Sequence, residues 1–229
     1  MTTLSDYISE CISESILSST RTGKAGIDAE LKKYDLDPRK VTLNADGTID
    51  YDGDVDLMRY GLTKLPFRFR KVKGDFDCSS NQLTTLDGAP ETVSDDFYCD
   101  YNYLTTLKGA PENVGGIFNC SHNKLITLEG APSKIEDNFN CIHNSITTLN
   151  YCPRVIKGAF SCYGNCLTSL EGGPEQVGRD YNCALNNLTS LVGLPKKLNR
   201  YLYCHDNSGR FTKEDVLALC DINRSNIYI

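Results

Sequence analysis

The chain lacks several features that would place it quickly in a class of proteins. None of its 229 residues is tryptophan and only three are histidine. No stretch approaches the length of apolar sequence, about 18 residues, that a membrane-spanning helix needs, and the N-terminus has neither the basic residues nor the apolar run of a secretory signal peptide. C-x-x-C spacing, typical of zinc sites, is absent as well. We therefore expect a cytoplasmic protein with no membrane segment, no metal and no cofactor.

Catalytic and nucleotide-binding motifs are missing too. Gly23-Lys24 lacks the upstream glycine and the following Ser or Thr of a phosphate-binding loop. No Ser/His/Asp, Cys/His or paired-carboxylate set recurs. The net charge of −6 disfavours general binding of nucleic acid, although basic residues alternate with aromatics over residues 67–73. These absences favour a non-enzymatic protein and make nucleic acid an unfavoured partner.

The clearest feature present is a cysteine at every 21st position over most of the chain. A fixed period of about 20 to 50 residues indicates a repeat architecture, in which each copy occupies the same structural position. The cysteines in phase are Cys78, Cys99, Cys120, Cys141, Cys162, Cys183 and Cys204.

Aligned on these cysteines, the repeats share the pattern aromatic-x-C-x-x-N-x-L-T-x-L-x-G-x-P-x-x-V, first clear in GDFDCSSNQLTTLDGAPETVS. This pattern resembles the leucine-rich repeat, and in particular the short 21-residue F-x-C-x-x-N-x-L-T-x-L-x-G-x-P type common in bacteriophage and prophage genomes. The resemblance covers roughly residues 46–229. It implies an α/β repeat fold, a leucine-rich-repeat solenoid of about eight turns with short parallel strands on its concave face. It also implies a phage-encoded protein that acts in the host cytoplasm.

Each repeat predicts one short strand with one buried face. Phe76-Asp77-Cys78 alternates apolar, polar and apolar residues, and such strands become stable only when stacked. We expect Asn81 and its equivalents to bond backbone groups where the strand turns, and to bond one another. The cysteines should form a ladder of buried positions. Disulfides between turns are disfavoured because stacked side chains do not bring Cβ atoms to about 3.8 Å, and buried thiols indicate a reducing compartment.

The two ends are expected to cover the open solenoid, which gives three segments: an N-terminal helical and hairpin cap (1–52), the solenoid (53–210) and a C-terminal cap (211–229). Ser5 should cap a first helix, residues 19–26 should form a loop, and a second helix should span 27–34. A hairpin follows, with its turn at Asp46-Gly47. Thr212 should cap a helix over 213–220, and residues 226–229 should form a closing strand.

The repeat also locates the outward side chains that flank the aromatic and the cysteine of each strand. The N-terminal third of this face carries six aspartates, and its C-terminal end carries aromatic residues. The predicted partner-binding residues are Asp54, Asp56, Asp75, Asp77, Asp96, Tyr98, Asp100, Tyr163, Tyr201, Tyr203 and His205. Ser79, Ser121 and Ala184 are expected on the same face. The alternative is a solvated face whose polar residues only maintain solubility.

Two histidines, and two cysteines outside the periodic set, are candidate metal ligands or catalytic residues. His122 and His143 occupy one position in neighbouring turns, with Tyr101 a turn earlier, and we expect them to pack together at the rim rather than share a metal. Cys152 and Cys166 fall outside the ladder, and neither has a histidine at a predictable catalytic distance.

Together these features predict a non-enzymatic protein-binding scaffold that binds a host protein with a basic surface. Our specific hypothesis is that it inhibits a host defence or regulatory protein through the acidic and aromatic face. Two alternatives stay open. One is a structural or assembly protein, self-associating or part of a virion, and the other is an enzyme with an unrecognised site.

Overall fold

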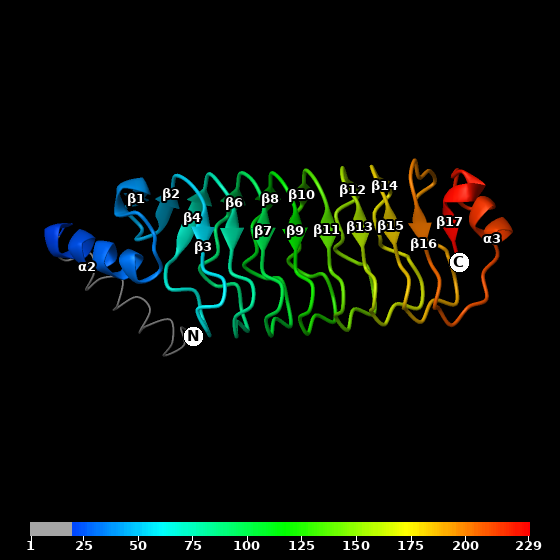
Figure 1. Cartoon of the computed structure of the whole chain (residues 1–229), viewed down its shortest axis with the longest axis horizontal. Coiled ribbons are helices and arrows are strands. Elements are labelled where there is room, and N and C mark those ends of the chain that lie inside the picture. The colour runs from blue at the N-terminus through cyan, green and yellow to red at the C-terminus, as the bar shows by residue number, and fades with distance from the viewer. Residues whose placement is uncertain (1–19) are drawn as a thin grey trace.

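The computed structural model describes residues 20–229 as a parallel-strand solenoid of about nine turns (Figure 1). In the view of Figure 1 the turns follow one another along a straight axis, with helix α2 at one end and helix α3 at the other. Each turn contributes a strand to a nine-stranded sheet, here called the front sheet, and most turns contribute a second strand to an eight-stranded back sheet. All strand pairs are parallel except the antiparallel pair β1–β2.

The strands are short. The front sheet contains β3 (Val55–Asp56), β5 (Phe76–Asp77), β7 (Phe97–Tyr98), β9 (Phe118–Asn119), β11 (Phe139–Asn140), β13 (Phe160–Ser161), β15 (Tyr181–Asn182), β16 (Leu202–Tyr203) and β17 (Ile227–Tyr228). The back sheet contains β1 (Val41–Leu43), β2 (Ile49–Tyr51), β4 (Phe69–Val72), β6 (Thr92–Val93), β8 (Asn113–Val114), β10 (Lys134–Ile135), β12 (Val155–Ile156) and β14 (Gln176–Val177).

The back sheet was not predicted from the sequence, which indicated one strand per turn. Its strands form at the end of each repeat, where an exposed or half-buried residue precedes a buried apolar one, as in Thr92–Val93. Two residues are too short an alternation to recognise as a strand. Pairing with the equivalent segments one turn away supplies the hydrogen bonds that a single copy lacks.

The core is built from columns of identical side chains. The front-sheet phenylalanines lie in register, and neighbouring rings have centroids 5.4 to 5.5 Å apart. The seven periodic cysteines are buried and unbridged. Burial raises the pKa of their thiols, as at Cys78, which keeps the sulfur protonated. The Cys78 thiol donates to the Tyr98 carbonyl one turn on, at 3.3 Å. A leucine at this position would fill the core without making that bond.

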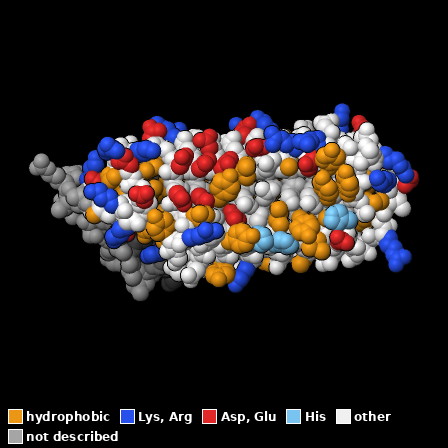
Figure 2. Space-filling view, in the orientation of Figure 1, with side chains coloured by type: hydrophobic (Ala, Val, Ile, Leu, Met, Phe, Trp, Pro, Cys, Tyr) orange, Lys and Arg blue, Asp and Glu red, His pale blue; other side chains and the backbone are white. Residues whose placement is uncertain are grey.

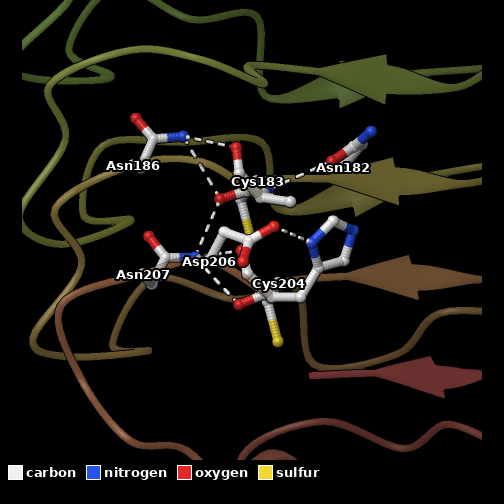
Figure 3. Close-up of polar contacts among 8 residues, drawn as sticks. Asn182, Cys183, Asn186, Cys204, Asp206 and Asn207 are labelled. Atoms are coloured by element: carbon white, nitrogen blue, oxygen red, sulfur yellow. Dashed lines mark hydrogen bonds and ion pairs between the residues drawn. The ribbon is translucent and has the colours of Figure 1, made fainter.

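The repeated asparagines bind backbone groups where the chain leaves each front strand. Oδ1 of Asn81 accepts from the Leu62 N–H at 2.9 Å, and Nδ2 donates to the carbonyls of Leu57 and Cys78. Figure 3 shows the amide of Asn186 donating to the Cys183 carbonyl, and that of Asn207 donating to the carbonyls of Cys183 and Cys204. The predicted backbone role is confirmed. The prediction that stacked amides bond one another is wrong, because every side-chain bond of these asparagines goes to the backbone.

The N-terminal region differs from the prediction in its helix. Residues 19–26 were expected to be a loop, yet α2 (Thr20–Lys33) is continuous from residue 20 and covers all but the last residue of the helix predicted over 27–34. It is held by Leu31, which is buried, and by Ile27, four residues earlier, which packs against the core. The helix predicted from Ser5 lies outside the described residues. A short 3₁₀ helix, η1 (Pro38–Lys40), leads into the predicted hairpin, whose turn contains Gly47 at φ +79°.

The C-terminal elements follow the sequence closely. Thr212 caps α3 (Lys213–Leu217), and its side chain and that of Asp215 bond each other's backbone N–H groups. The helix ends at Leu217 rather than extending to residue 220. A 3₁₀ turn, η2 (Arg224–Asn226), precedes β17, which pairs with β16 as the predicted closing strand. Over residues 20–229, no helix has the length and apolar character needed to cross a bilayer.

Candidate partner-binding face

The predicted partner-binding residues lie on or beside the face of the front sheet, which is the face seen in Figure 2. Asp54 and Asp56 are exposed, and the other nine are half-buried. Three neighbouring positions differ from expectation: Ser79, Ser121 and Ala184 are buried. They directly follow the cysteines, where the backbone turns away from the sheet, so small side chains there are covered by adjacent turns.

The aspartates form rows along the solenoid and also bind its backbone. In the first row, Asp54, Asp75 and Asp96 each accept, through Oδ1, the N–H at the same position one turn on, at 2.6 to 3.0 Å. In the second row, Asp56 and Asp77 accept the N–H two residues ahead, at 2.9 and 2.8 Å. Five of the six aspartates therefore have a structural role that sequence reasoning missed.

Asparagine performs the same two roles farther along the solenoid. Oδ1 of Asn138 accepts the Ala159 N–H at 2.7 Å, as the first-row aspartates do for their neighbours. Asn119 and Asn182 likewise accept the N–H two residues ahead, as the second row does. An amide oxygen thus satisfies these backbone groups without a charge. The negative charge of the N-terminal rows is additional to what the fold requires.

That charge is not neutralised within the described part of the chain. None of the six aspartates forms an ion pair with a Lys or Arg among residues 20–229. The back sheet and its edges differ, since Asp50 pairs with Arg70, Asp52 with Lys73 and Glu136 with Lys157. Figure 2 accordingly shows acidic side chains gathered on one half of the front face.

Two aspartates in the acidic half have a raised pKa. Burial, with a smaller contribution from nearby Asp77, raises the pKa of Asp100 to about 6. Burial and the neighbouring aspartates also raise the pKa of Asp75. The Tyr98 hydroxyl donates to Oδ2 of Asp96 at 2.6 Å, so Tyr98 belongs to the acidic half rather than to an aromatic anchor. Crowded carboxyl groups destabilise their own ionised forms, a cost that a cationic partner would relieve.

The aromatic end of the face contains a residue that the sequence argument missed. Tyr201 and Tyr203 lie with Tyr228 of β17, whose ring stacks on that of Tyr203 at 5.0 Å. The sequence did offer a signal for Tyr228. Residues 226–229 were predicted to form the closing strand, and pairing that strand with the last repeat places Tyr228 beside Tyr203. His205 lies beside them on the chain and contacts Asp206 through Nδ1, at 2.7 Å.

Tyr163 is not part of that aromatic end. Its ring packs against His143 at 5.2 Å, His143 against His122 at 4.9 Å, and His122 against Tyr101 at 4.2 Å. The predicted packing of the two histidines is therefore confirmed, and we name these four rings the aromatic ridge. Gly164 leaves room for it, since a Cβ there would lie 2.5 Å from Nδ1 of His143.

The described residues show no constellation for a metal. No group of three or more His, Cys, Asp or Glu side chains among them could hold an ion. Of the described cysteines outside the periodic set, Cys152 and Cys220 are buried and Cys166 is exposed. No protein-family model, curated protein or solved structure matches the chain. Functional inference therefore rests on the geometry of this face and on the repeat pattern.

Proposed function

We propose that this chain is a non-enzymatic protein-binding scaffold that holds a partner with a basic surface on the acidic half of its front sheet. One observation carries the proposal: aspartate stands where asparagine serves the backbone equally well, and no cation of the described chain pairs with it. Unpaired like charges on one face steer a cationic partner toward it and strengthen the encounter complex.

We further propose that the scaffold is a leucine-rich-repeat protein of the short phage type, with residues 1–52 and 211–229 as its caps. The repeat pattern F-x-C-x-x-N-x-L-T-x-L-x-G-x-P supports this assignment. On this proposal the protein acts in the cytoplasm of a bacterial host and inhibits a host defence or regulatory protein by occluding its basic surface. Repeat proteins commonly bind other macromolecules through such an extended sheet face.

Host capture with charge-matched variants tests the proposal. The front variant carries Asp56→Asn, Asp75→Asn and Asp77→Asn, which keep the backbone bonds and remove three charges. The control carries Glu91→Gln, Glu112→Gln and Glu171→Gln, which remove three exposed charges away from the front sheet. Bacterial lysate is passed over each immobilised protein and the bound proteins are quantified by mass spectrometry. We expect a basic protein that the wild type and the control retain and the front variant loses. Equal retention by all three proteins would refute an acidic binding face.

A second candidate function, self-association, is favoured by the C-terminal end. Leu217, Leu219, Tyr228 and Ile229 are large apolar side chains exposed on α3, on β17 and just after each of them. They lie where the front sheet ends and a further strand could add. Light scattering over a range of concentrations tests this candidate. A monomer at all concentrations, for the wild type and for Leu219→Lys alike, would exclude it.

A further inference from the structure

The aromatic ridge continues the acidic half of the front face around its edge. Tyr101, the first ring of the ridge, directly follows Asp100 and is 55% exposed. Tyr103, two residues on, is 49% exposed, and Ile126, in the following repeat, is 57% exposed. Figure 2 shows hydrophobic and histidine side chains bordering the acidic group on this side of the molecule. One surface therefore offers unpaired carboxylates and, next to them, exposed apolar and aromatic side chains.

The backbone turn beneath three of the ridge's rings does not require a ring. Tyr101, His122 and His143 have φ values of +52°, +54° and +50°, in the left-handed region that large side chains avoid. The same position has the same sign of φ in the other turns, where it holds Arg59, Ser80, Gly164, Leu185 and Asp206. The turn thus forms without a ring, and rings are placed here at a conformational cost. Such strain concentrates at positions that serve binding.

The ridge is also rigid and compatible with cationic neighbours. Its rings pack against one another in a row, stacked between Tyr101 and His122, tilted between the two histidines and edge-on between His143 and Tyr163, so each ring restricts the next. Little side-chain entropy remains to be lost when a partner covers them. Beside the ridge, the Lys124 ammonium lies 4.6 Å from the ring centre of Tyr103. An aromatic face there already binds a lysine side chain of the same kind that the acidic rows would attract.

We infer that this surface binds a basic amphipathic segment of another protein, with its Lys or Arg side chains on the aspartate rows and its apolar side chains over the aromatic ridge. The inference rests on the proposed function and specifies the partner. Charge complementarity selects the occupant, because the front sheet that carries the ridge also carries six aspartates, with Asp100 next to Tyr101, and no described Lys or Arg pairs with them. A purely basic partner would leave the exposed rings uncovered. A purely apolar one would bury carboxylates without partners, which is strongly unfavourable.

Two peptides of equal charge test the inference on the full chain. One alternates lysine with leucine in an amphipathic pattern, and the other replaces every leucine with glycine. Binding is measured by calorimetry for the wild type, for the front variant described above, and for a ridge variant carrying Tyr101→Asn and His143→Asn. Asparagine tolerates the left-handed backbone, so the ridge variant should melt at the same temperature as the wild type or higher.

We expect the wild type to bind the leucine peptide at least tenfold more tightly than the glycine peptide. The ridge variant should lose that preference while still binding both peptides, and the front variant should bind both weakly. If the wild type binds the two peptides equally, or the ridge variant keeps the preference, the inference is wrong and the proposed function stands. If the front variant binds as the wild type does, or neither peptide binds, both are wrong. If the wild type and the front variant are dimers and the ridge variant alone is a monomer, the ridge binds a second copy of the chain and the inference is wrong.

Discussion

The main-chain N–H of Asp96 donates to Oδ1 of Asp75 at 2.8 Å, so a surface carboxylate of one turn holds the backbone of the next. Asn138 makes the same bond, to the N–H of Ala159, at 2.7 Å. The bond and the charge are therefore separable by substitution. The fold needs the oxygen, and our account of function needs the charge.

Asp75→Ala and Asp75→Asn should differ in stability for this reason. The alanine variant loses a hydrogen bond to a half-buried N–H, and its free energy of unfolding should be about 1 kcal/mol lower than that of the wild type. The asparagine variant keeps the bond and relieves repulsion from Asp54 and Asp96, so its stability should equal or exceed that of the wild type. Urea unfolding at pH 7 measures both. Equal losses in the two variants would mean that the charge itself stabilises the fold.

Asn102 should be among the most sensitive positions in the solenoid. It is buried, its Oδ1 accepts the Leu83 N–H at 2.9 Å, and its Nδ2 donates to the Cys78 and Cys99 carbonyls. Asn102→Ala leaves several buried backbone groups without a hydrogen-bond partner and should lower the free energy of unfolding by about 2 to 4 kcal/mol. Denaturant unfolding of Asn102→Ala beside Thr84→Ala, an exposed residue of the preceding repeat, makes the comparison. Similar stability of the two variants would contradict the role assigned to the asparagine column.

Removal of the Tyr181 hydroxyl should stabilise the folded protein. It occupies the phenylalanine column, packs against Phe160 at 5.2 Å, and its buried hydroxyl has no hydrogen-bond partner. Tyr181→Phe removes that uncompensated polar group and should raise the unfolding free energy by about 1 kcal/mol. The converse substitution, Phe160→Tyr, should lower it. A destabilised Tyr181→Phe protein would show that the hydroxyl has a favourable contact.

Asp100 makes stability depend on pH in a defined direction. Its pKa in the folded protein, about 6, lies above that of an unfolded aspartate, so the folded state takes up this proton first as the pH falls. The contribution of Asp100 to stability is fully present below pH 4 and is lost as the pH rises through 6. Between pH 7 and pH 4, the wild type should therefore gain about 1 kcal/mol relative to Asp100→Asn. The value is reduced from the full shift because solvent screens this half-buried group. Unfolding of both proteins at several pH values measures the difference, and parallel profiles would contradict the burial of the carboxyl.

The sequence predicted those parts of the structure that repeat. The 21-residue period placed the phenylalanine column, the asparagines and the buried cysteines because each copy reinforces the same pattern. The outward aspartates and tyrosines were found by strand alternation from those columns. The back sheet was missed because Thr92–Val93 is too short to show a period.

The remaining misses concern residues whose role depends on three-dimensional contacts. The helical state of residues 20–26 depends on how Leu31 and Ile27, later in the same helix, pack against the core. The backbone bonds of Asp54, Asp75 and Asp96 run between turns, so no local pattern reveals them. Three rings of the aromatic ridge, Tyr101, His122 and His143, were recognised as a column, but Tyr163 was assigned to the C-terminal end, and the left-handed backbone of the column is visible only in the structure.

The central claim is that negative charge on the front sheet, and not on the rest of the surface, binds a basic partner. Its most direct test is the affinity of the captured host protein for three chains: the wild type, the triple front variant Asp56→Asn/Asp75→Asn/Asp77→Asn, and the control Glu91→Gln/Glu112→Gln/Glu171→Gln. We predict that the front variant binds at least tenfold more weakly, that the control binds as the wild type does, and that added salt narrows the difference. An equal loss of affinity in the front variant and the control would show that only net charge matters, and would contradict a binding site on this face.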